Sequence, residues 1–421
     1  MSKLLDQAEA AKKAARKLAG LSTDVKNRAL LGIAEALVAR QDEILAANAQ
    51  DIERARDAGL ADAPLNRLKL TPEKIASIAA DVRTVAALPD PVGEIIDGRT
   101  LPNGLQVSRR RVPLGVIAAI YESRPNVTID IASLCLKSGN ACILRGGSEA
   151  IRSNTVLSRI AVEAETAAGV PEGALQFIES TERALVGELL ALRRYIDLVV
   201  PRGGEELIRY VAENASMPVL TGGVGVCHTY VDRAADLQKA LDVAVNAKTR
   251  NWSICNAMDT LLVHREVAAE YLPRLAERYA VAGVELRCDE RAMAALARAG
   301  NGVHAVAASE DDFGREFLAP VAAVKVVDSL DEAIEHIAAY GTGHSDAIVT
   351  EDYEAGRRFM DEVDTAVVYW NASTQFTDGA QFGLGAEIID STQKTIARGP
   401  VGLREITTYK WYVLGNGQTR P

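Results

Sequence analysis

The stretch Leu114–Arg145, LGVIAAIYESRPNVTIDIASLCLKSGNACILR, decides the fold class. It starts with a short apolar run that ends at Tyr121 and finishes with a second one at Ala141–Arg145, while the segment between them has the pattern of a helix. Two strands that are joined through a helix run parallel in one sheet. The stretch therefore predicts a βαβ unit.

The same alternation continues downstream of this unit. Three further apolar runs follow at 175–178, 196–200 and 217–222, and helical segments separate them. Five strand candidates with helices between them predict a doubly wound parallel sheet, which is a platform that binds nucleotides at the carboxyl ends of its strands.

The first ~90 residues are predicted to be helical. In Asp24–Arg40 the apolar residues recur at helical spacing, with Ser22 or Thr23 placed to cap the start, and Thr71 is the expected N-cap of a helix that begins at Pro72. Alternation around a Pro-Asn-Gly turn then predicts a hairpin at 96–112.

A second α/β domain is predicted from about Thr229 onward. Its expected helices lie at 235–248, 266–280, 330–339 and 352–361, and its expected strands at 260–264, 320–327, 345–349 and 365–369. The tail Arg404–Leu414 alternates like an edge strand and has nothing downstream to pair with. The predicted division is a first domain at 1–228, a second at 229–380 and a return segment at 381–421.

Composition limits the class of protein. The chain of 421 residues is too long for one core, and 48% hydrophobic with 25% charged residues is the balance of a globular protein. A net charge of −10 argues against a nucleic-acid binder, and no apolar run approaches the ~20 residues that span a bilayer. The N-terminal segment lacks the apolar core of a signal peptide. The expectation is a cytoplasmic enzyme or binding protein.

The five cysteines are odd in number, scattered and never spaced as C-x-x-C. This pattern indicates a reducing compartment and disfavours both a disulfide framework and a zinc site. The histidines show no metal-ligand spacing either, so no metal site is predicted. Cys135 and Cys142 lie in apolar patterns and are expected in the core.

Cys255 is the first candidate for chemistry. Polar residues surround it, namely Asn251, Ser253 and Asn256, and Lys248 lies just upstream. A nucleophilic cysteine needs an accessible sulfur and a setting that favours the thiolate, which these neighbours suggest. Cysteine is also among the most buried residue types, so a packing role stays open.

Two glycine turns join a strand to a helix, at Arg145–Ala150 and at Pro201–Leu207. Gly203 and Gly204 allow a ligand close to the backbone, and a helix N-terminus offers amides to an anion. Neither turn has the G-x-G-x-x-G spacing, so an ordinary connection is also possible.

Polar residues follow the first strand, where Arg124 and Asn126 flank Pro125, which restricts the backbone. They either line a site or cap the next helix. His344 is expected in a loop before a strand, where histidines are usually solvated.

Together these pieces resemble the aldehyde dehydrogenase superfamily. The stretches that carry the resemblance are IYESRPNVTIDIASLCLKSGNACILRGGSEA, NWSICNAMDTLLVH, EFLAPV and VVDSLDEAIEHIAAYGTGHSDAIVTED, and the last matches the branch that reduces L-glutamyl 5-phosphate. The resemblance spans the chain. It implies an α/β fold of two doubly wound domains with a small β-hairpin oligomerisation element, and a homodimer or homotetramer.

The resemblance also implies site residues. Cys255 falls on the catalytic cysteine, and Glu316 on the glutamate that holds the nicotinamide ribose. Arg145 replaces a lysine that contacts the adenosine ribose, and Ser148 stands where NAD-preferring members often have a glutamate. A carboxylate there would repel a 2′-phosphate, so this sequence favours NADP(H). Asn126 is the candidate for the oxyanion asparagine.

One departure from the family pattern is informative. General members carry a glutamate base that activates water, whereas the corresponding segment here, Pro218–Tyr230, has no carboxylate. An enzyme that transfers its acyl group to phosphate does not need that base. The resemblance thus implies NADPH-dependent reduction of L-glutamyl 5-phosphate to L-glutamate 5-semialdehyde and phosphate through a thioacyl on Cys255, which is the second step of L-proline biosynthesis.

The substrate carries a carboxylate and a phosphate, so cationic or polar groups must meet it. Arg124, His228 and His344 are the hypothesised set, chosen for their expected loop settings. Glutamate 5-kinase, which would make the labile acyl phosphate, is a possible partner. Two alternatives stay open: another acylating dehydrogenase, such as one dependent on coenzyme A, and a binding protein that has kept the fold without the activity.

Overall fold

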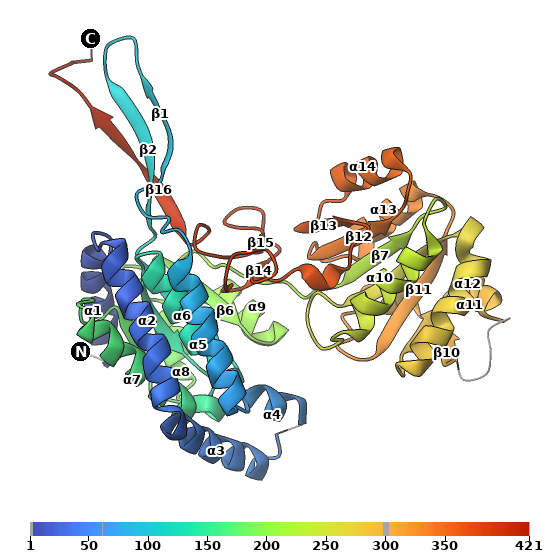
Figure 1. Cartoon of the computed structure of the whole chain (residues 1–421), viewed down its shortest axis with the longest axis horizontal. Coiled ribbons are helices and arrows are strands. Elements are labelled where there is room, and N and C mark those ends of the chain that lie inside the picture. The colour runs from blue at the N-terminus through green and yellow to red at the C-terminus, as the bar shows by residue number, and fades with distance from the viewer. Residues whose placement is uncertain (1–2, 61, 298–302, 421) are drawn as a thin grey trace. The chain divides into compact units, whose positions relative to one another are not determined.

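The computed structural model describes residues 3–60, 62–297 and 303–420 and divides the chain into two compact units, coloured along the chain in Figure 1. Unit 1 comprises Met1–Gly222, Gly383–Ile389 and Pro400–Pro421, and unit 2 comprises Gly223–Phe382 and Asp390–Gly399. The first boundary lies close to the predicted one at 228. The predicted return segment is shared between the units, because 390–399 belongs to unit 2.

Unit 1 begins with helices, as predicted. They are α1 (Lys3–Leu18), α2 (Thr23–Ala39), α3 (Gln41–Asp57), α4 (Asp62–Leu68) and α5 (Pro72–Ala87). Ser22 caps α2 through the backbone N–H of Val25, and Thr71 caps α5 through that of Lys74. The apolar face of α2 is buried and packs against α5, so the helical spacing in the sequence reflects a real core face.

The sheet of unit 1 has four parallel strands in the order β5-β4-β3-β6. The strands are β3 (Val116–Tyr121), β4 (Ala141–Arg145), β5 (Leu175–Phe177) and β6 (Leu198–Arg202), and the helices between and after them are α6 (Asn126–Lys137), α7 (Ile151–Ala167), α8 (Ala184–Leu190) and α9 (Glu205–Asn214). Every residue of β3 is buried, as expected for a strand that is covered on both faces.

The predicted fifth strand at 217–222 is wrong. Val219 and Gly222 each form only a single β-bridge, and that of Val219 runs parallel to Val199. Pro218 has no N–H to donate to a ladder, and the glycines that follow at 222 and 223 do not favour an extended strand. The segment lies beside β6 without extending the sheet.

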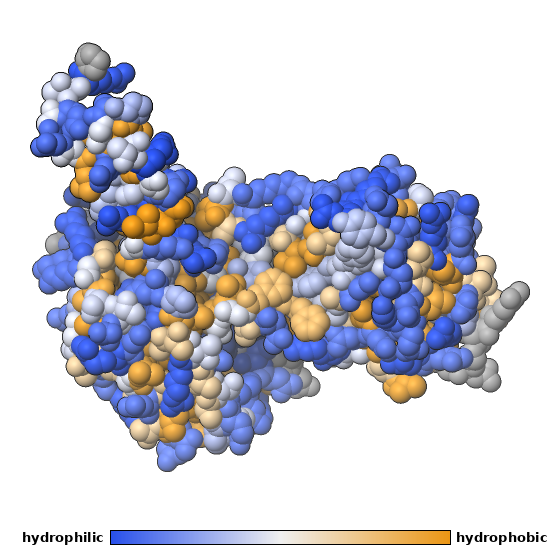
Figure 2. All heavy atoms as spheres, turned by 45° about the horizontal axis from the view of Figure 1, so that its top comes forward, coloured by the Kyte–Doolittle hydropathy of each residue, from blue (hydrophilic) through white to orange (hydrophobic). Residues whose placement is uncertain are grey.

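A three-stranded antiparallel sheet projects from the rest of unit 1 (Figure 1). The predicted hairpin forms from β1 (Ile95–Thr100) and β2 (Gln106–Pro113), and β16 (Thr407–Leu414) pairs along the whole of β2. The tail, for which no partner was expected downstream, therefore finds its partner far upstream. Figure 2 shows both hydrophobic and hydrophilic side chains on this sheet, and Trp411 and Val413 are among the exposed apolar ones.

Unit 2 contains seven parallel strands in the order β10-β9-β11-β8-β7-β12-β13. They are β7 (Cys227–Val231), β8 (Met258–His264), β9 (Glu285–Cys288), β10 (Ala305–Ala307), β11 (Val321–Val327), β12 (Ser345–Val349) and β13 (Val367–Trp370). The accompanying helices are α10 (Leu237–Thr249), α11 (Arg265–Val281), α12 (Glu290–Leu296), α13 (Leu330–Tyr340) and α14 (Tyr353–Glu362). All four predicted helices and all four predicted strands are present.

Two cores flank this sheet. Leu261 of β8 belongs to a core that α10, α11 and α12 share, whereas the next residue, Leu262, belongs to a second core with α13 and α14. Neighbouring side chains of a strand point to opposite faces, so helices cover the sheet on both sides. This is the doubly wound arrangement that the sequence predicts.

Short elements complete the described chain, namely η1 (Ser148–Ala150), η2 (Glu310–Asp312), η3 (Thr374–Phe376), β14 (Asp390–Ser391) and β15 (Gly399–Pro400). Among the described residues, every helix is too short or too polar to traverse a lipid bilayer.

Candidate active site

Cys255 lies in the loop between α10 and β8, at the amino-terminal edge of the unit 2 sheet. It is half-buried, whereas the other four cysteines of the chain, Cys135, Cys142, Cys227 and Cys288, are buried. Burial raises the pKa of Cys288 to about 12 and that of Cys227 well above its usual value, so these two stay protonated. Exposure therefore singles out Cys255 as the thiol that a reactant can reach.

The segment around η3 fastens the Cys255 loop. Gln375 donates from Nε2 to the carbonyls of Ala247 at 2.9 Å and Asn251 at 3.1 Å, and Thr374 donates from Oγ1 to the carbonyl of Asn256 at 2.6 Å. These bonds fix the chain on both sides of the cysteine. The loop is thus positioned through its backbone carbonyls, and nothing in the loop sequence identifies η3 as its partner.

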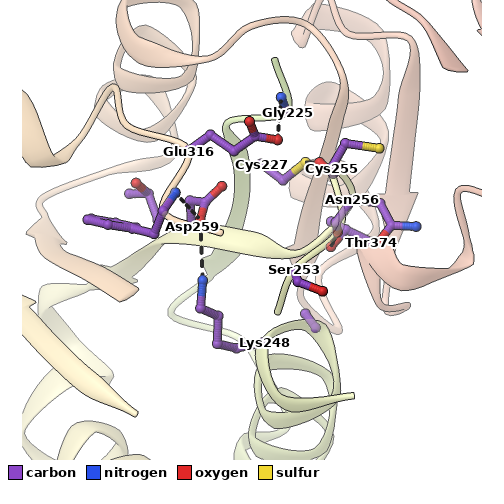
Figure 3. A network of polar contacts seen from close by, with 12 residues as sticks. Gly225, Cys227, Lys248, Ser253, Cys255, Asn256, Asp259, Glu316 and Thr374 are labelled. Atoms are coloured by element: carbon purple, nitrogen blue, oxygen red, sulfur yellow. Dashed lines mark hydrogen bonds and ion pairs between the residues drawn. The ribbon is translucent and has the colours of Figure 1, made fainter. Parts of the chain in front are cut away.

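Gly225 brings a second segment against the cysteine. A Cβ at this position would lie 1.8 Å from the carbonyl oxygen of Cys255, a distance that only glycine permits. The N–H of Gly225 donates to Oε1 of Glu316 at 3.1 Å, and the thiol of Cys227 contacts the Cys255 carbonyl at 3.2 Å (Figure 3). Gly225 therefore contacts both the Glu316 carboxylate and the Cys255 backbone.

A buried ion pair lies behind the loop. Lys248 Nζ is 3.2 Å from Asp259 Oδ1, which also accepts the N–H of Phe317 at 3.2 Å. Burial lowers the pKa of Lys248 and raises that of Asp259 to about 6, which shows that both charges are costly there. Figure 3 shows Lys248 reaching toward Asp259 while the Cys255 sulfur points elsewhere. Asp259 of this pair holds the backbone of Phe317, so Lys248 is not the cation beside the thiol that its sequence position suggests.

His344 directly precedes β12 and is buried. Its Nδ1 lies 2.9 Å from Ser345 Oγ and 3.8 Å from Cys227 Sγ. A ring nitrogen of His344, the sulfur of Cys255 and a carboxylate oxygen of Asp390 all lie within 4.8 Å of one another. The structure thus brings His344 to the cysteine, together with an aspartate that the sequence did not identify.

His228 is not in a loop, contrary to the expectation. It is a buried residue of β7, and its Nδ1 lies 3.0 Å from Asp346 Oδ1 on the neighbouring strand β12. The same carboxylate oxygen accepts the His228 backbone N–H at 2.8 Å. A partner on the next strand allows a polar side chain inside the sheet. His228 was chosen as a substrate contact because it was expected in a loop. Its place in β7 removes that reason.

The candidates of unit 1 gather at the carboxyl ends of β3, β4 and β6. The strand order reverses between β3 and β6, which is where doubly wound sheets bind ligands. Arg145 ends β4, the exposed Ser148 starts η1, and Gly203 and Gly204 connect β6 to α9. These four residues share one edge of the sheet, as the sequence predicts.

Two carboxylates that the sequence did not single out as cofactor ligands organise this edge. Glu122 accepts the N–H of Gly204 at 3.0 Å, and Glu149 accepts the hydroxyl of Ser123 at 2.9 Å. The Gly204 amide that was expected to meet an anion is therefore engaged by Glu122. Burial lowers the pKa of Arg145, and its buried Nε has no hydrogen-bond partner among the described residues.

Asn126 is the first residue of α6, and its amide donates to Asp130 at 2.8 Å. Burial raises the pKa of Asp130 to about 6. Arg124 lies in the loop before α6 and is half-buried. Asn126 and Arg124 belong to unit 1, and Cys255 and His344 to unit 2.

A parallel-sheet unit with glycine turns at its switch point and a second α/β unit with a half-buried thiol form an architecture that dehydrogenases use. The chain belongs to the aldehyde dehydrogenase family, whose model matches residues 3–301 and 303–411. Within that family it is similar to gamma-glutamyl phosphate reductases.

The similarity to these relatives covers the whole chain. Identity is 55% to the gamma-glutamyl phosphate reductase of Dehalococcoides mccartyi, covering 99% of this chain and 98% of that protein, and 54% to that of Roseiflexus castenholzii, covering 100% of both. The crystal structure of the Thermotoga maritima enzyme of the same name is 48% identical, covers 100% of both chains and superposes with a TM-score of 0.96. An acetylating aldehyde dehydrogenase from Geobacillus thermoglucosidasius, 20% identical over 100% of this chain and 98% of its own, shares the fold with a TM-score of 0.72.

Proposed function

We propose that this oxidoreductase reduces L-glutamyl 5-phosphate to L-glutamate 5-semialdehyde and phosphate with NADPH, the second step of L-proline biosynthesis from glutamate. The name that its relatives carry supports the substrate. The observation that carries the chemistry is the half-buried Cys255, held by η3 on one side and by Gly225 on the other.

In the proposed mechanism the Cys255 thiolate attacks the acyl carbon, and phosphate leaves to give a thioacyl enzyme. The Cys255 backbone N–H and the Asn126 amide are the proposed donors to the developing oxyanion. Hydride transfer, which would reduce the thioester to the aldehyde, is the chemistry that NADPH would supply when bound. The fixed loop limits the motion of the sulfur, which favours attack in one geometry.

The residues of unit 1 fit a phosphorylated dinucleotide. Arg145 has a buried Nε without a partner among the described residues, and Ser148 beside it is exposed and uncharged. An anion near Arg145 would satisfy that nitrogen. We assign Arg145, Ser148, Gly203 and Gly204 to NADP(H) binding, with Glu316 of unit 2 at the nicotinamide ribose. Glu122 fixes the backbone of this edge.

The acyl acceptor in the reverse direction is proposed to be phosphate. The segment Pro218–Tyr230, which leads into β7, contains no carboxylate to activate water. Arg124 and His344 are the proposed contacts of the substrate carboxylate and phosphate, since Arg124 is in a loop and His344 lies near Cys255.

The assembly and location are also proposals. Exposed Tyr409, Trp411 and Val413 on β16 form an apolar strip that a second copy would cover in a homodimer or homotetramer. Glutamate 5-kinase is the proposed supplier of the labile acyl phosphate, and the cytoplasm is the proposed compartment.

The test is the reverse reaction, with glutamate 5-semialdehyde, NADP and phosphate, followed through NADPH absorbance. We expect NADP reduction that requires phosphate, is lost in Cys255→Ala and is kept in Cys288→Ala, the matched control at a buried thiol. Reduction without phosphate would indicate a hydrolytic dehydrogenase, and a requirement for coenzyme A another acylating enzyme. Either result would overturn the proposal.

A further inference from the structure

We propose that Cys255, His344 and Asp390 form a binding site for a thiophilic divalent cation, with Zn²⁺ the best match, and that the bound ion blocks the Cys255 thiol reversibly. The binding half of this inference stands on unit 2 alone. The blocking half rests on the proposed function, because it takes Cys255 as the nucleophile.

The three candidate ligand atoms come from three separate segments of unit 2. Cys255 precedes β8, His344 precedes β12, and Asp390 starts β14. The sulfur, a ring nitrogen and a carboxylate oxygen lie within 4.8 Å of one another. Bond lengths of about 2.0–2.3 Å in a tetrahedral zinc site place its ligand atoms roughly 3.5 Å apart. Small side-chain rotations therefore close the cluster around an ion.

The surroundings of His344 point independently to a ligand. The residue is only 2% exposed, and its Nε2 is buried with no hydrogen-bond partner within the described ranges. The other ring nitrogen, Nδ1, lies 2.9 Å from Ser345 Oγ, which in turn lies 2.6 Å from Thr377 Oγ1. When Nδ1 carries the proton and donates it to Ser345, Nε2 keeps a lone pair. Metal-binding histidines are typically held in this way through the nitrogen that does not bind the metal.

A buried nitrogen without a partner is costly, and a metal ion would remove that cost. The hydrogen-bonded hydroxyls continue beyond Thr377, whose Oγ1 also lies 2.8 Å from the hydroxyl of Tyr369. This chain fixes the plane of the imidazole before any ion arrives. The site is therefore partly preorganised at its histidine.

Charge and softness favour zinc. The Cys255 thiolate and the Asp390 carboxylate together carry two negative charges, which neutralise one divalent cation, and one proton leaves the thiol as the metal–sulfur bond forms. A sulfur ligand disfavours Mg²⁺ and Ca²⁺. Three protein ligands leave a fourth position for water. Such an open site releases its ion to a chelator more readily than a closed four-ligand site.

The direct test is binding of Co²⁺, a spectroscopic substitute for Zn²⁺, to the full chain. We expect one Co²⁺ per chain with a sulfur-to-cobalt charge-transfer band. The band should vanish in Cys255→Ser, and affinity should fall at least tenfold in His344→Asn and in Asp390→Asn. Cys288→Ser and Asp361→Asn, a buried thiol and an exposed carboxylate elsewhere in unit 2, serve as matched controls and should bind like the wild type.

A second measurement needs no variant. Zn²⁺ should slow alkylation of Cys255 by iodoacetamide at least tenfold, as read by peptide mass spectrometry, and EDTA should restore the original rate. Thermal melting of each variant verifies that it folds. Co²⁺ binding without the sulfur band, or affinity unchanged in both His344→Asn and Asp390→Asn, would overturn the site.

The two proposals fail separately. Phosphate-dependent activity in a wild type that binds neither ion would refute the metal site and leave the proposed function intact. Co²⁺ binding in a protein without phosphate-dependent activity would refute the proposed function and the blocking role, and keep the site. Zn²⁺ that binds at Cys255 without inhibiting an active enzyme would refute the blocking role alone.

Discussion

Gly225→Ala should separate catalysis from folding most sharply. The new Cβ would lie 1.8 Å from the Cys255 carbonyl oxygen and 2.7 Å from its carbonyl carbon, whereas real Cβ atoms stay beyond 3.0 Å. The two segments must therefore move apart by about 1 Å. A displacement of that size at a reacting group costs roughly 10²-fold in rate, or about 2.7 kcal/mol of transition-state stabilisation.

The assay is kcat for phosphate-dependent NADP reduction, measured beside the thermal melting temperature. The matched control is Gly314→Ala in the same unit, where the nearest heavy atom to a new Cβ is 3.6 Å away. We expect kcat to fall about 100-fold in Gly225→Ala and to stay within twofold in the control. A Gly225→Ala enzyme that keeps more than a third of the wild-type kcat would refute the argument that this contact positions the cysteine.

Three further predictions concern stability and assembly. Asp259→Leu should lower the free energy of unfolding by about 3–5 kcal/mol, because Lys248 is left buried and unpaired. Adding Lys248→Met should recover most of the loss. Urea denaturation measures both variants, and an Asp259→Leu protein as stable as the wild type would contradict this prediction. Burial raises the pKa of Glu165 to about 8 from 4.5, so the folded state holds a proton that the unfolded state has lost. Wild-type stability should therefore fall as pH rises through about 4.5–8, by at most about 5 kcal/mol, and Glu165→Gln should remove that fall. Trp411→Ser should shift the protein toward smaller assemblies by light scattering, and an unchanged mass would remove this residue from the interface.

The sequence predicts those parts of the fold whose residue pattern suits only one kind of secondary structure. Val116–Tyr121 is a continuous apolar run that ends at polar residues, and a strand buried on both faces is the structure that suits it. Capped amphipathic helices such as Pro72–Ala87 are equally explicit. By contrast, β9 and β10 have four and three residues, too few for a periodic pattern.

What the sequence could not predict depends on partners far along the chain. His228 lies inside a strand because Asp346, 118 residues later, pairs with its Nδ1 and accepts its backbone N–H. The tail β16 pairs with β2, which occurs about 300 residues earlier. Gln375 and Asp390 meet the Cys255 loop only through the tertiary fold, and the local sequence around each shows no catalytic pattern. Pairing of this kind is set by packing and leaves no periodic signal.

We propose that Cys255 forms an acyl enzyme whose acceptor is phosphate. Rapid mixing of the enzyme with glutamate 5-semialdehyde and NADP in phosphate-free buffer tests it directly, with NADPH and the mass of the intact protein followed together. We expect a burst of one NADPH per site, an acyl adduct on Cys255, and turnover only after phosphate is added. Steady NADPH formation without phosphate, or a burst that survives in Cys255→Ala, would contradict it.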